Sequence, residues 1–560
     1  MSAASTVIRC LRTLADLADV RGADVEGADL RRVADAFTPL SSGAAADIVR
    51  RARRDGLQGY PGIPGTSHEL IRAFVAGGTN AGGPWQAGLP SLYSRLLGDG
   101  VIDSAEASTL VRQRGILTLS DLQTALDEGS IGQRGANGLE QRLQQTARAL
   151  ERDRPPIPLG RARDLLDTLA GEMFATARID LATPAGDVRR FESLVSGLVI
   201  VARASDPQSA LEAICALRSV DEVRHRSGGR ALLCLHQTEV DVRVAAPDEY
   251  GTVLFHATGS PAHVRAIHER RGAAPLSARE EDVYARAELP FIAPELRQGS
   301  GELEAAASGR LPSLIAHAHV RGDLHLHTMY SDGADTLDAM VAACARLGYG
   351  YIAITDHSER AAASRTVSTS DLSRQRDEIY AIRERYPAMA ILHGIEVDIM
   401  PDGSLDFPDR ILESLDIVLA SLHDSARHDA KRLTRRCIQA IRHPLVNVVT
   451  HPANRLVGRR EGYPLDFEAV FAAAAETGTA LEVDGAPSHL DLDGEHARAA
   501  VEAGVTLTID SDCHRARLLR RQMELGIGTA RRGWVEPRHV LNTRPLHEVL
   551  AFIAAKRARG

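Results

Sequence analysis

The sequence predicts a multidomain protein of the α and α/β classes: a helical region, then a small α+β unit, then a C-terminal parallel (β/α)7 barrel. Three observations support this prediction. Apolar residues recur three and four positions apart in the first 150 residues; helical and β patterns alternate over 155–295; and seven apolar, β-branched runs follow residue 318. The length of 560 residues, with 44% apolar and 25% charged residues, is typical of a folded chain with several domains.

The first 150 residues are expected to form helices joined by glycine-bearing turns. Residues 11–20 and 28–37 have the helical spacing, and the turns fall at 59–65, 98–100 and 135–138. A helix, a glycine turn and a second helix can present backbone N–H groups to a DNA phosphate, as in a helix-hairpin-helix. A plain connection between helices explains the same spacing, so both interpretations stay open.

The proline-rich stretch 155–158 marks the boundary to an α+β unit that extends to 295. Its clearest strands are expected at 198–202, 232–235 and 240–244. A loose stretch over 296–317 is interpreted as a linker, and the barrel is assigned to 318–560.

The seven runs of the barrel each end in polar residues. They lie at 322–327, 351–357, 391–396, 417–423, 446–451, 480–484 and 506–514. Strands that alternate with helices form parallel barrels, in which the C-terminal ends of the strands meet on one face and carry the chemistry. Each run ends in His, Asp or Glu, so the sequence predicts a functional site on that face.

Nine residues form a set of potential metal ligands: eight lie in the polar ends of six of these runs, and Asp332 follows the first run in a glycine-bearing turn. His325 and His327 are two apart and point to one side of a strand, and the same spacing recurs in Asp512 and His514. The full set is His325, His327, Asp332, His357, Glu396, His423, His451, Asp512 and His514. Imidazoles with a few carboxylates suit zinc, manganese or iron. Nine donors are too many for one ion, so two or three metals sharing the bridging carboxylate Glu396 are expected.

Other residues of the barrel receive supporting roles. Asp323 and Asp356 flank ligands and are expected to orient imidazoles. Seven further histidines lack a position at a strand end and are interpreted as structural: His317, His319, His393, His428, His443, His489 and His496.

Closely spaced divalent ions suit the hydrolysis of phosphate esters, because they activate water and hold phosphoryl oxygens. The catalytic candidates are the carboxylates Glu396 and Asp512 and the cations Arg455 and Arg459; Arg460 lies beside them in sequence. A solvated loop explains the arginines equally well.

Composition excludes several classes of function. Lys431 and Lys556 are the only lysines, so no lysine Schiff base forms within residues 1–300. The net charge of −8 means that contacts with DNA must come from local patches. Six scattered cysteines indicate a reducing cytoplasm. Neither a membrane span nor a signal peptide is expected.

The motifs GDLHLHTMYSDG, ITDHS, HGIEVDIMPDGSLDFPD, ASLH, HPANRLVGRRE and DSDCH resemble those of a PHP domain (polymerase and histidinol phosphatase) over residues 320–545. The resemblance implies a distorted seven-stranded barrel with three Mn²⁺ or Zn²⁺ ions, iron being a further option, on the nine residues above. The stretches PDGSLDFPD, RLVGRRE and RRGWVEPRHVLNT are similar to the branch fused to bacterial family X DNA polymerases.

The N-terminal half is similar to that branch in outline, with helix-hairpin-helix repeats and a nucleotidyltransferase-like palm, but it departs where polymerase chemistry occurs. Asp187 replaces a serine that contacts the triphosphate, and Ser196 and Leu198 replace two metal-binding aspartates. The third aspartate is retained as Asp241, and Pro261 replaces a lysine. Because Mg²⁺ needs charged oxygen ligands, loss of polymerase activity is expected.

The leading hypothesis is a metal-dependent phosphoesterase, a 3′–5′ exonuclease or 3′-end processing enzyme that acts on gapped or 3′-ended DNA in repair. No membrane partner and no obligate protein partner are expected. One alternative is a small-molecule phosphomonoesterase of the histidinol-phosphatase type. Another is a non-catalytic DNA-binding repair scaffold.

Overall fold

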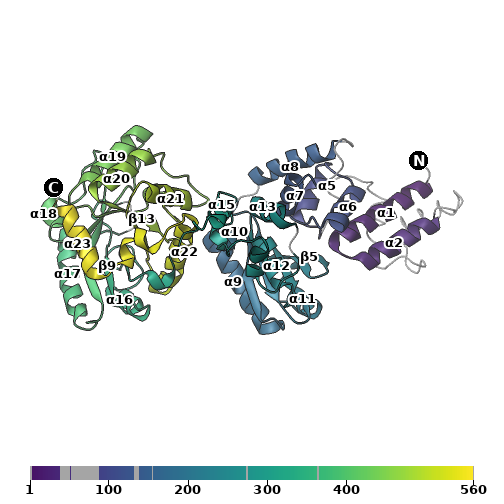
Figure 1. The fold of residues 1–560 in the computed structure, drawn as a ribbon, viewed down its shortest axis with the longest axis horizontal. Helices are drawn as coiled ribbons and strands as arrows, with labels where there is room; N and C mark the ends of the chain where they lie inside the picture. The colour runs from purple at the N-terminus through teal and green to yellow at the C-terminus, as the bar shows by residue number, and fades with distance from the viewer. Residues whose placement is uncertain are drawn as a thin grey trace. The chain divides into compact units, whose positions relative to one another are not determined.

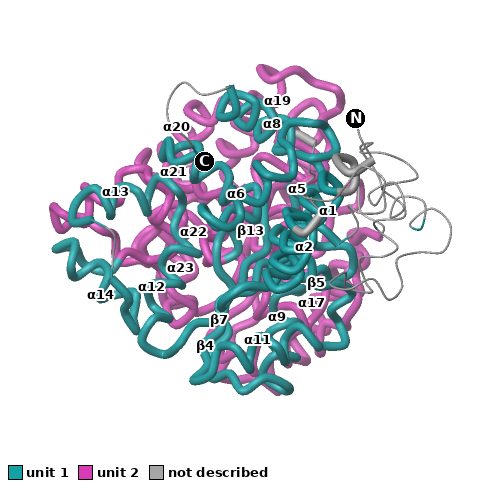
Figure 2. The backbone as a smooth tube through the Cα atoms, turned by 90° about the vertical axis from the view of Figure 1, so that its right-hand side faces the viewer, with its two compact units in different colours: residues 1–156, 163–188, 196–291 teal, residues 157–162, 189–195, 292–560 magenta. Residues whose placement is uncertain are grey.

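The computed structural model describes residues 3–37, 51, 88–131, 138–153, 156–272, 275–361 and 365–558. The chain divides into two compact units (Figure 2). Unit 1 comprises Met1–Pro156, Arg163–Val188 and Ser196–Phe291, and unit 2 comprises Ile157–Ala162, Arg189–Val195 and Ile292–Gly560. The glycine turn expected at 59–65 and most of the turn at 135–138 lie outside the described residues.

The N-terminal part of unit 1 is helical, as predicted. Its helices are α1 (Ala3–Arg21), α2 (Asp24–Phe37), α5 (Ser91–Gly98), α6 (Ser104–Arg114), α7 (Leu119–Asp127) and α8 (Leu139–Asp153). The turn at 98–100 joins α5 to α6, and Gly100 adopts a φ of +67° there. Asp103 and Glu106 form a capping box at the start of α6, and Thr118 and Asp121 do the same for α7.

The second part of unit 1 is a five-stranded sheet. Its strands are β2 (Leu181–Pro184), β4 (Leu198–Arg203), β5 (Glu222–Ser227), β6 (Arg230–Leu235) and β7 (Thr238–Ala245), in the order β2-β4-β7-β6-β5. Only β4 and β7 pair in parallel. The helices in this part are α9 (Leu159–Thr176, whose first turn belongs to unit 2), α10 (Gly186–Arg189), α11 (Pro207–Cys215), α12 (Tyr250–Thr258), α13 (Pro261–Arg271) and α14 (Glu280–Arg286). The three strands expected here are confirmed.

Unit 2 contains the predicted parallel barrel. Its strands are β8 (Gly322–Asp323), β9 (Tyr351–Ile354), β10 (Ala390–Asp398), β11 (Ile417–Ser421), β12 (Val448–Val449), β13 (Ala480–Asp484) and β14 (Leu507–Asp510). They pair in sequence order, all in parallel. An isolated parallel bridge between Leu326 and Cys513 brings the first and last strands together, so the barrel is nearly closed.

Helices surround the strands of the barrel (Figure 1). They are α16 (Leu337–Arg346), α17 (Thr369–Arg383), α18 (Asp409–Leu412), α19 (Ala430–Arg442), α20 (Phe467–Thr477), α21 (Gly494–Glu502), α22 (Leu519–Arg532) and α23 (Leu546–Arg557). Among the helices of the described segments, none is long and apolar enough to cross a membrane.

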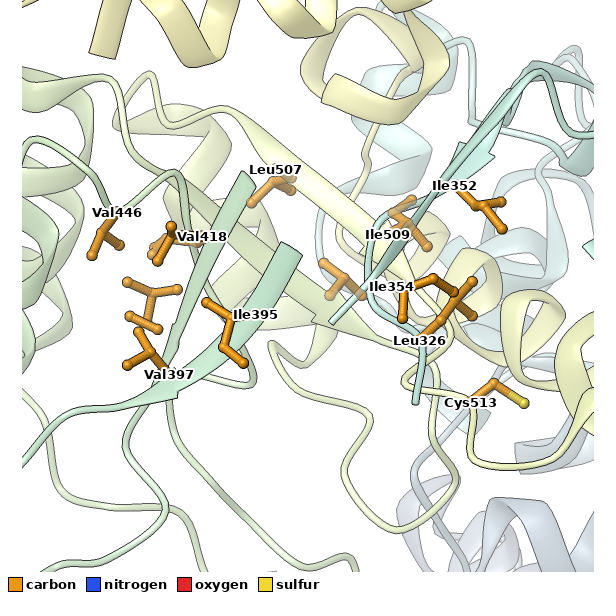
Figure 3. Close-up of a cluster of buried hydrophobic side chains, with 14 of the residues drawn as sticks. Leu326, Ile352, Ile354, Ile395, Val397, Val418, Val446, Leu507, Ile509 and Cys513 are labelled. Carbon is orange, nitrogen blue, oxygen red and sulfur yellow. The ribbon is translucent and has the colours of Figure 1, made fainter. Parts of the chain in front are cut away.

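Alternation along the strands separates two apolar clusters. Ile352 and Val418 belong to the large cluster that also contains residues of the surrounding helices (Figure 3). Their neighbours Tyr351 and Ile417 belong to a smaller cluster, with Val549 of α23. Because side chains alternate with a period of two, Glu396 shares a side of β10 with Leu392 of the smaller cluster. The face of β10 that carries Leu392 thus ends in the polar group of Glu396.

The stretch 296–317, expected to be a linker, belongs to unit 2 and contains the short helix α15 (Glu302–Ala307). Arg297 is fully buried and donates from Nε to the carbonyl of Ile292 over 2.9 Å. Arg531 of α22 donates from Nη1 to the carbonyl of Ile315 over 2.8 Å, and it also pairs with Glu295, just before the stretch, at 2.7 Å. These contacts make the stretch part of the packing of unit 2, which a local sequence pattern does not reveal.

Two segments from within the α+β region also belong to unit 2. They include the antiparallel strands β1 (Ile157–Pro158) and β3 (Leu194–Val195). Phe191 lies against Gly528 of α22, where a β-carbon would come within 1.9 Å of the ring. Arg532 pairs with Glu192 at 2.8 Å. The packing of unit 2 therefore includes residues that precede the barrel by more than a hundred positions.

Candidate metal centre

Glu396 lies at the centre of the polar end of the barrel and is fully buried. Its Oε1 is 3.0 Å from His451 Nε2 and 3.5 Å from His423 Nε2. Its Oε2 is 2.7 Å from His357 Nδ1, 3.5 Å from His325 Nε2 and 3.6 Å from His327 Nε2. One carboxylate therefore faces five imidazoles, as expected for a bridging ligand.

Asp512 and Asp332 complete the set on the other side of His327. Asp512 Oδ1 is 3.0 Å from His327 Nε2 and 3.7 Å from His325 Nε2. Asp332 Oδ1 is 3.2 Å from His514 Nε2 and 3.5 Å from His357 Nε2. The structure thus brings all nine residues of the sequence-predicted set into one cluster.

Three overlapping groups within this cluster have the spacing of metal ligands. They are His327, Asp332, His357 and His514; His325, His327 and Asp512; and His357, Glu396 and His423. His451 joins the third group through Glu396.

Burial and mutual charge shape the protonation of the cluster. Burial alone raises the pKa of Glu396, but the neighbouring His325, His357 and His423 outweigh it and hold this pKa well below its ordinary value. Burial, together with His514 and His357, lowers the pKa of His327 to about 3. Glu396 is therefore ionised and His327 is neutral at neutral pH, which are the states that bind metals.

The backbone is strained at two of the nine positions. His451 and Asp512 adopt φ angles of +27° and +46°, in the region that residues with a β-carbon seldom occupy. Such conformations persist where the surrounding structure imposes them, and they concentrate at functional sites.

The residues that orient the imidazoles differ from those expected. Glu482 Oε1 lies 2.7 Å from His325 Nδ1, and Asp398 accepts a short hydrogen bond from His423 Nδ1. Asp323 instead accepts from the backbone N–H of Ser511, at 3.2 Å. Asp356 accepts from the loop after β8, including the Thr328 N–H at 2.8 Å. The expectation for Asp323 and Asp356 was wrong, because both carboxylates hold backbone turns rather than rings.

In the loop that follows β12, Arg455 and Arg460 donate to backbone carbonyls rather than to the nine donors. Arg455 donates from Nε to the carbonyl of His489 over 2.9 Å, and its Nη1 lies 3.4 Å from Asp493. Arg460 donates to the carbonyl of Asn454 over 2.8 Å. Arg459 is exposed in the same loop.

Two residues outside the predicted set also reach the cluster. Asp484 ends β13, and His489 follows it in the next loop; together with Asp512 they form a fourth group with metal-ligand spacing. Asp484 had a signal in the sequence, because it ends a predicted strand just as the other donors do. His489 had none beyond its residue type; it was interpreted as structural, and its place in this group differs from that interpretation.

The donor set fits divalent metals. Six imidazoles and three carboxylates face one another, and His325 Nε2 and His327 Nε2 are 3.0 Å apart. Glu396 Oε2 is buried and, among the described residues, receives no hydrogen bond of acceptable geometry. Cations between these atoms would satisfy groups that are otherwise costly to bury. A parallel barrel with this cluster at its strand ends defines a metal-dependent phosphoesterase.

Comparison with known proteins identifies the family. Residues 323–462 match the model of the PHP domain. The chain is 29% identical to DNA polymerase/3′-5′ exonuclease PolX of Bacillus subtilis, over 98% of both chains. It is 33% identical to a probable phosphatase of Caldanaerobacter subterraneus, over 34% of this chain and 75% of that relative. The zinc-, histidinol- and phosphate-bound histidinol phosphate phosphatase of Lactococcus lactis is 14% identical, with a TM-score of 0.30 over 38% of this chain and 93% of that one. The chain belongs to the PHP domain family, and over nearly its whole length it is similar to a PolX polymerase and 3′-5′ exonuclease.

In the polymerase-like region of unit 1, the polar residues form ion pairs and hydrogen bonds with one another. Asp241 on β7 is buried and accepts from Arg230 Nε at 2.8 Å and from Arg243 Nη2 at 2.8 Å. Arg230 also donates to Asp121 of α7 at 2.7 Å. Asp187 accepts from the backbone N–H of Ser196 at 2.8 Å. Two guanidinium groups therefore surround the retained aspartate.

Proposed function

We propose that unit 2 is a 3′–5′ exonuclease or 3′-end processing enzyme that acts on gapped or 3′-ended DNA in the cytoplasm. The observation that carries this proposal is the convergence of nine donors at the polar end of the barrel, where five imidazoles face Glu396. The alignment with a polymerase and 3′–5′ exonuclease over 98% of both chains supports DNA as the substrate. Three ions, Mn²⁺ or Zn²⁺, would occupy the nine residues.

The chain's own residues would prepare the site. Bound divalent ions would supply water activation and stabilise charge on phosphoryl oxygens. Glu396 would bridge ions, while Glu482 and Asp398 fix the rings of His325 and His423. At the other end of the cluster, Asp512 would hold ions together with His327, whose Nε2 lies 3.0 Å from its Oδ1. Arg459 is exposed in the loop that follows β12, and we propose it for a contact with a phosphate of the substrate.

A basic helix face favours DNA over a small substrate. Helix α19 follows β11, whose polar end leads to His423, so its first turns lie toward the rim with the metal centre. Lys431, Arg432 and Arg435 are exposed on this helix. A surface of this kind contacts phosphates along a nucleic-acid backbone.

We propose further that unit 1 lacks polymerase activity. Arg230 and Arg243 neutralise the charge of Asp241, which a metal ion would otherwise neutralise. Ser196 and Leu198 supply no carboxylates for a metal. Asp187 adds a negative charge where the family has a serine that contacts the triphosphate. Unit 1 would then hold DNA or serve as a support.

The test uses 5′-labelled primer–template and single-stranded DNA with Mn²⁺, with and without dNTPs, and with an EDTA control. Stepwise shortening that EDTA stops, without extension, supports both proposals. Extension by dNTPs would refute the loss of polymerase activity. Intact DNA together with turnover of a small phosphomonoester would instead favour the phosphatase alternative, which the probable phosphatases similar to the barrel support.

A further inference from the structure

The polar end of strand β13 carries a carboxylate that the nine-residue cluster does not use. Asp484 is fully buried, and its Oδ1 accepts from the backbone N–H of Ala486 at 2.6 Å. Its Oδ2 has no hydrogen-bond partner among the described residues. A buried carboxylate oxygen without a donor is costly, so it marks a position that a cation would satisfy.

His489 is held with one ring nitrogen ready to accept. Its Nδ1 lies 2.9 Å from the carbonyl of Arg455. A carbonyl only accepts, so Nδ1 carries the proton and Nε2 keeps its lone pair. This pattern, in which one nitrogen donates to a carbonyl, is common in histidines that bind metals through the other nitrogen.

Arg455 fixes this ring through a reciprocal contact. Its Nε donates to the carbonyl of His489 at 2.9 Å, while its own carbonyl accepts from the His489 ring. The ring is also stacked on His451, with centroids 5.0 Å apart and planes at 18°. Arg455 is therefore a positioning residue for His489.

Each of Asp484, His489 and Asp512 offers a ligand atom, and the three atoms lie within 4.8 Å of one another. Asp512 is also a member of the nine-residue cluster, at 3.0 Å from His327 Nε2. We infer that Asp484, His489 and Asp512 form an additional divalent-cation site that shares Asp512 with that cluster. Two carboxylates and one imidazole suit borderline metals such as Zn²⁺, Mn²⁺ or Co²⁺. The inference rests on the proposed metal-dependent function and adds a cation to it.

The test counts metals in the full-length protein. The chain is stripped with a chelator and titrated with Co²⁺ against a chromophoric competitor, and the visible absorption of bound Co²⁺ is recorded. The unmodified protein should bind one more equivalent of Co²⁺ than the His489→Ala variant does. Otherwise it should bind its weakest Co²⁺ equivalent at least tenfold more tightly than that variant does. Asp484→Asn should lose the same equivalent, and Arg455→Met should weaken it.

The matched control is His443→Ala, because His443 is half-buried and belongs to none of the four groups. If His489→Ala loses its metal-free melting transition, His489→Gln replaces it. Equal stoichiometry and affinity in the unmodified chain, the His489 variant and Asp484→Asn would overturn the additional site. Failure of the unmodified chain to bind Co²⁺ at all would instead contradict the proposed function.

Discussion

The same residue type has opposite roles in the two units. Asp512 faces the imidazoles of the metal centre, whereas Asp241 is neutralised by arginines. A carboxylate among imidazoles can bind cations from solution, because an imidazole can release its proton and then bind a metal together with the carboxylate. A carboxylate between two guanidinium groups is already balanced and serves the fold. The surroundings of each aspartate, rather than its presence, therefore decide its function.

The first prediction concerns the metal centre. His325→Ala and Asp512→Ala each remove a donor from a shared group, so hydrolysis of bis-p-nitrophenyl phosphate should fall by at least about 100-fold, the upper range for loss of support to a metal. Metal content should fall in parallel while circular dichroism stays unchanged. His443→Ala, a half-buried histidine outside the groups, is the control. Full activity in either variant contradicts the site.

The second prediction concerns Asp241. Arg230→Met leaves this buried carboxylate with one cation fewer, and removing a partner from a buried pair costs about 3–5 kcal/mol of unfolding free energy. Denaturant unfolding measures this loss. Arg203→Met, which breaks a more exposed pair with Asp180, should cost at most about 1 kcal/mol. Equal effects of the two changes would contradict the role given to Arg230.

The acid dependence of this contribution follows from the same contacts. Burial raises the pKa of Asp241, but Arg230 and Arg243 outweigh it and lower that pKa below the ordinary 3.8. A lowered folded-state pKa means that the stabilisation is complete above about pH 4 and is lost on further acidification. Arg230→Met should therefore destabilise the protein less at pH 2 than at pH 7.

At the scale of elements, the pattern of each strand explains both packing and site. A strand that is apolar on both faces and ends in His, Asp or Glu suits a parallel sheet covered on both faces, such as a barrel, with its polar end at the rim. This pattern predicted the barrel and all nine members of the cluster. It did not predict His489, which lies in a loop where Arg455 contacts both its ring and its carbonyl.

The basic face of α19 leads to the third prediction. Exchange of Lys431, Arg432 and Arg435 for Glu should slow the shortening of single-stranded DNA at least tenfold and weaken its salt dependence, because phosphate contacts are lost. Hydrolysis of a small phosphodiester should not change. The control exchanges Arg346, Arg385 and Arg442, exposed residues at or just after the C-terminal ends of helices, for Glu. Equal slowing by both triple variants would contradict a DNA contact at α19.

The fourth prediction concerns the contact of α22 with Phe191. Gly528→Ala places a methyl group against the ring and should cost about 1–3 kcal/mol through overpacking. Gly171→Ala, in α9, meets no atom of the described residues within 4 Å and should be neutral or stabilising by up to about 1 kcal/mol. Thermal unfolding of the two variants measures the difference.

At the scale of the molecule, the sequence predicted the kinds of structure in order but not which segments pack together. Local periodicity identified the helical region, the sheet and the barrel. It gave no sign that 157–162 and 189–195 belong with the barrel, or that 296–317 is packed rather than loose. Those assignments depend on contacts between residues hundreds of positions apart, such as Phe191 with Gly528.

The fifth prediction follows from this organisation. A fragment of residues 292–560 lacks two segments of unit 2, so its metal-loaded form should hydrolyse a small phosphodiester but melt at a lower temperature than unit 2 of the full chain. A fragment of 315–560 also loses the buried Arg297 and the pair of Glu295 with Arg531, and should melt lower still. Identical melting of all three would show that these segments do not stabilise the barrel.

The packing of 189–195 on α22 also has a consequence for synthesis on the ribosome. Arg532 donates to the carbonyl of Arg190, a residue 342 positions earlier in the chain. Protein synthesis adds about 5–20 residues per second, so residues 189–195 are made on the order of tens of seconds before α22. During that interval Phe191 and its neighbours have no final packing surface, so a chaperone has its longest opportunity to act on this part of the nascent chain.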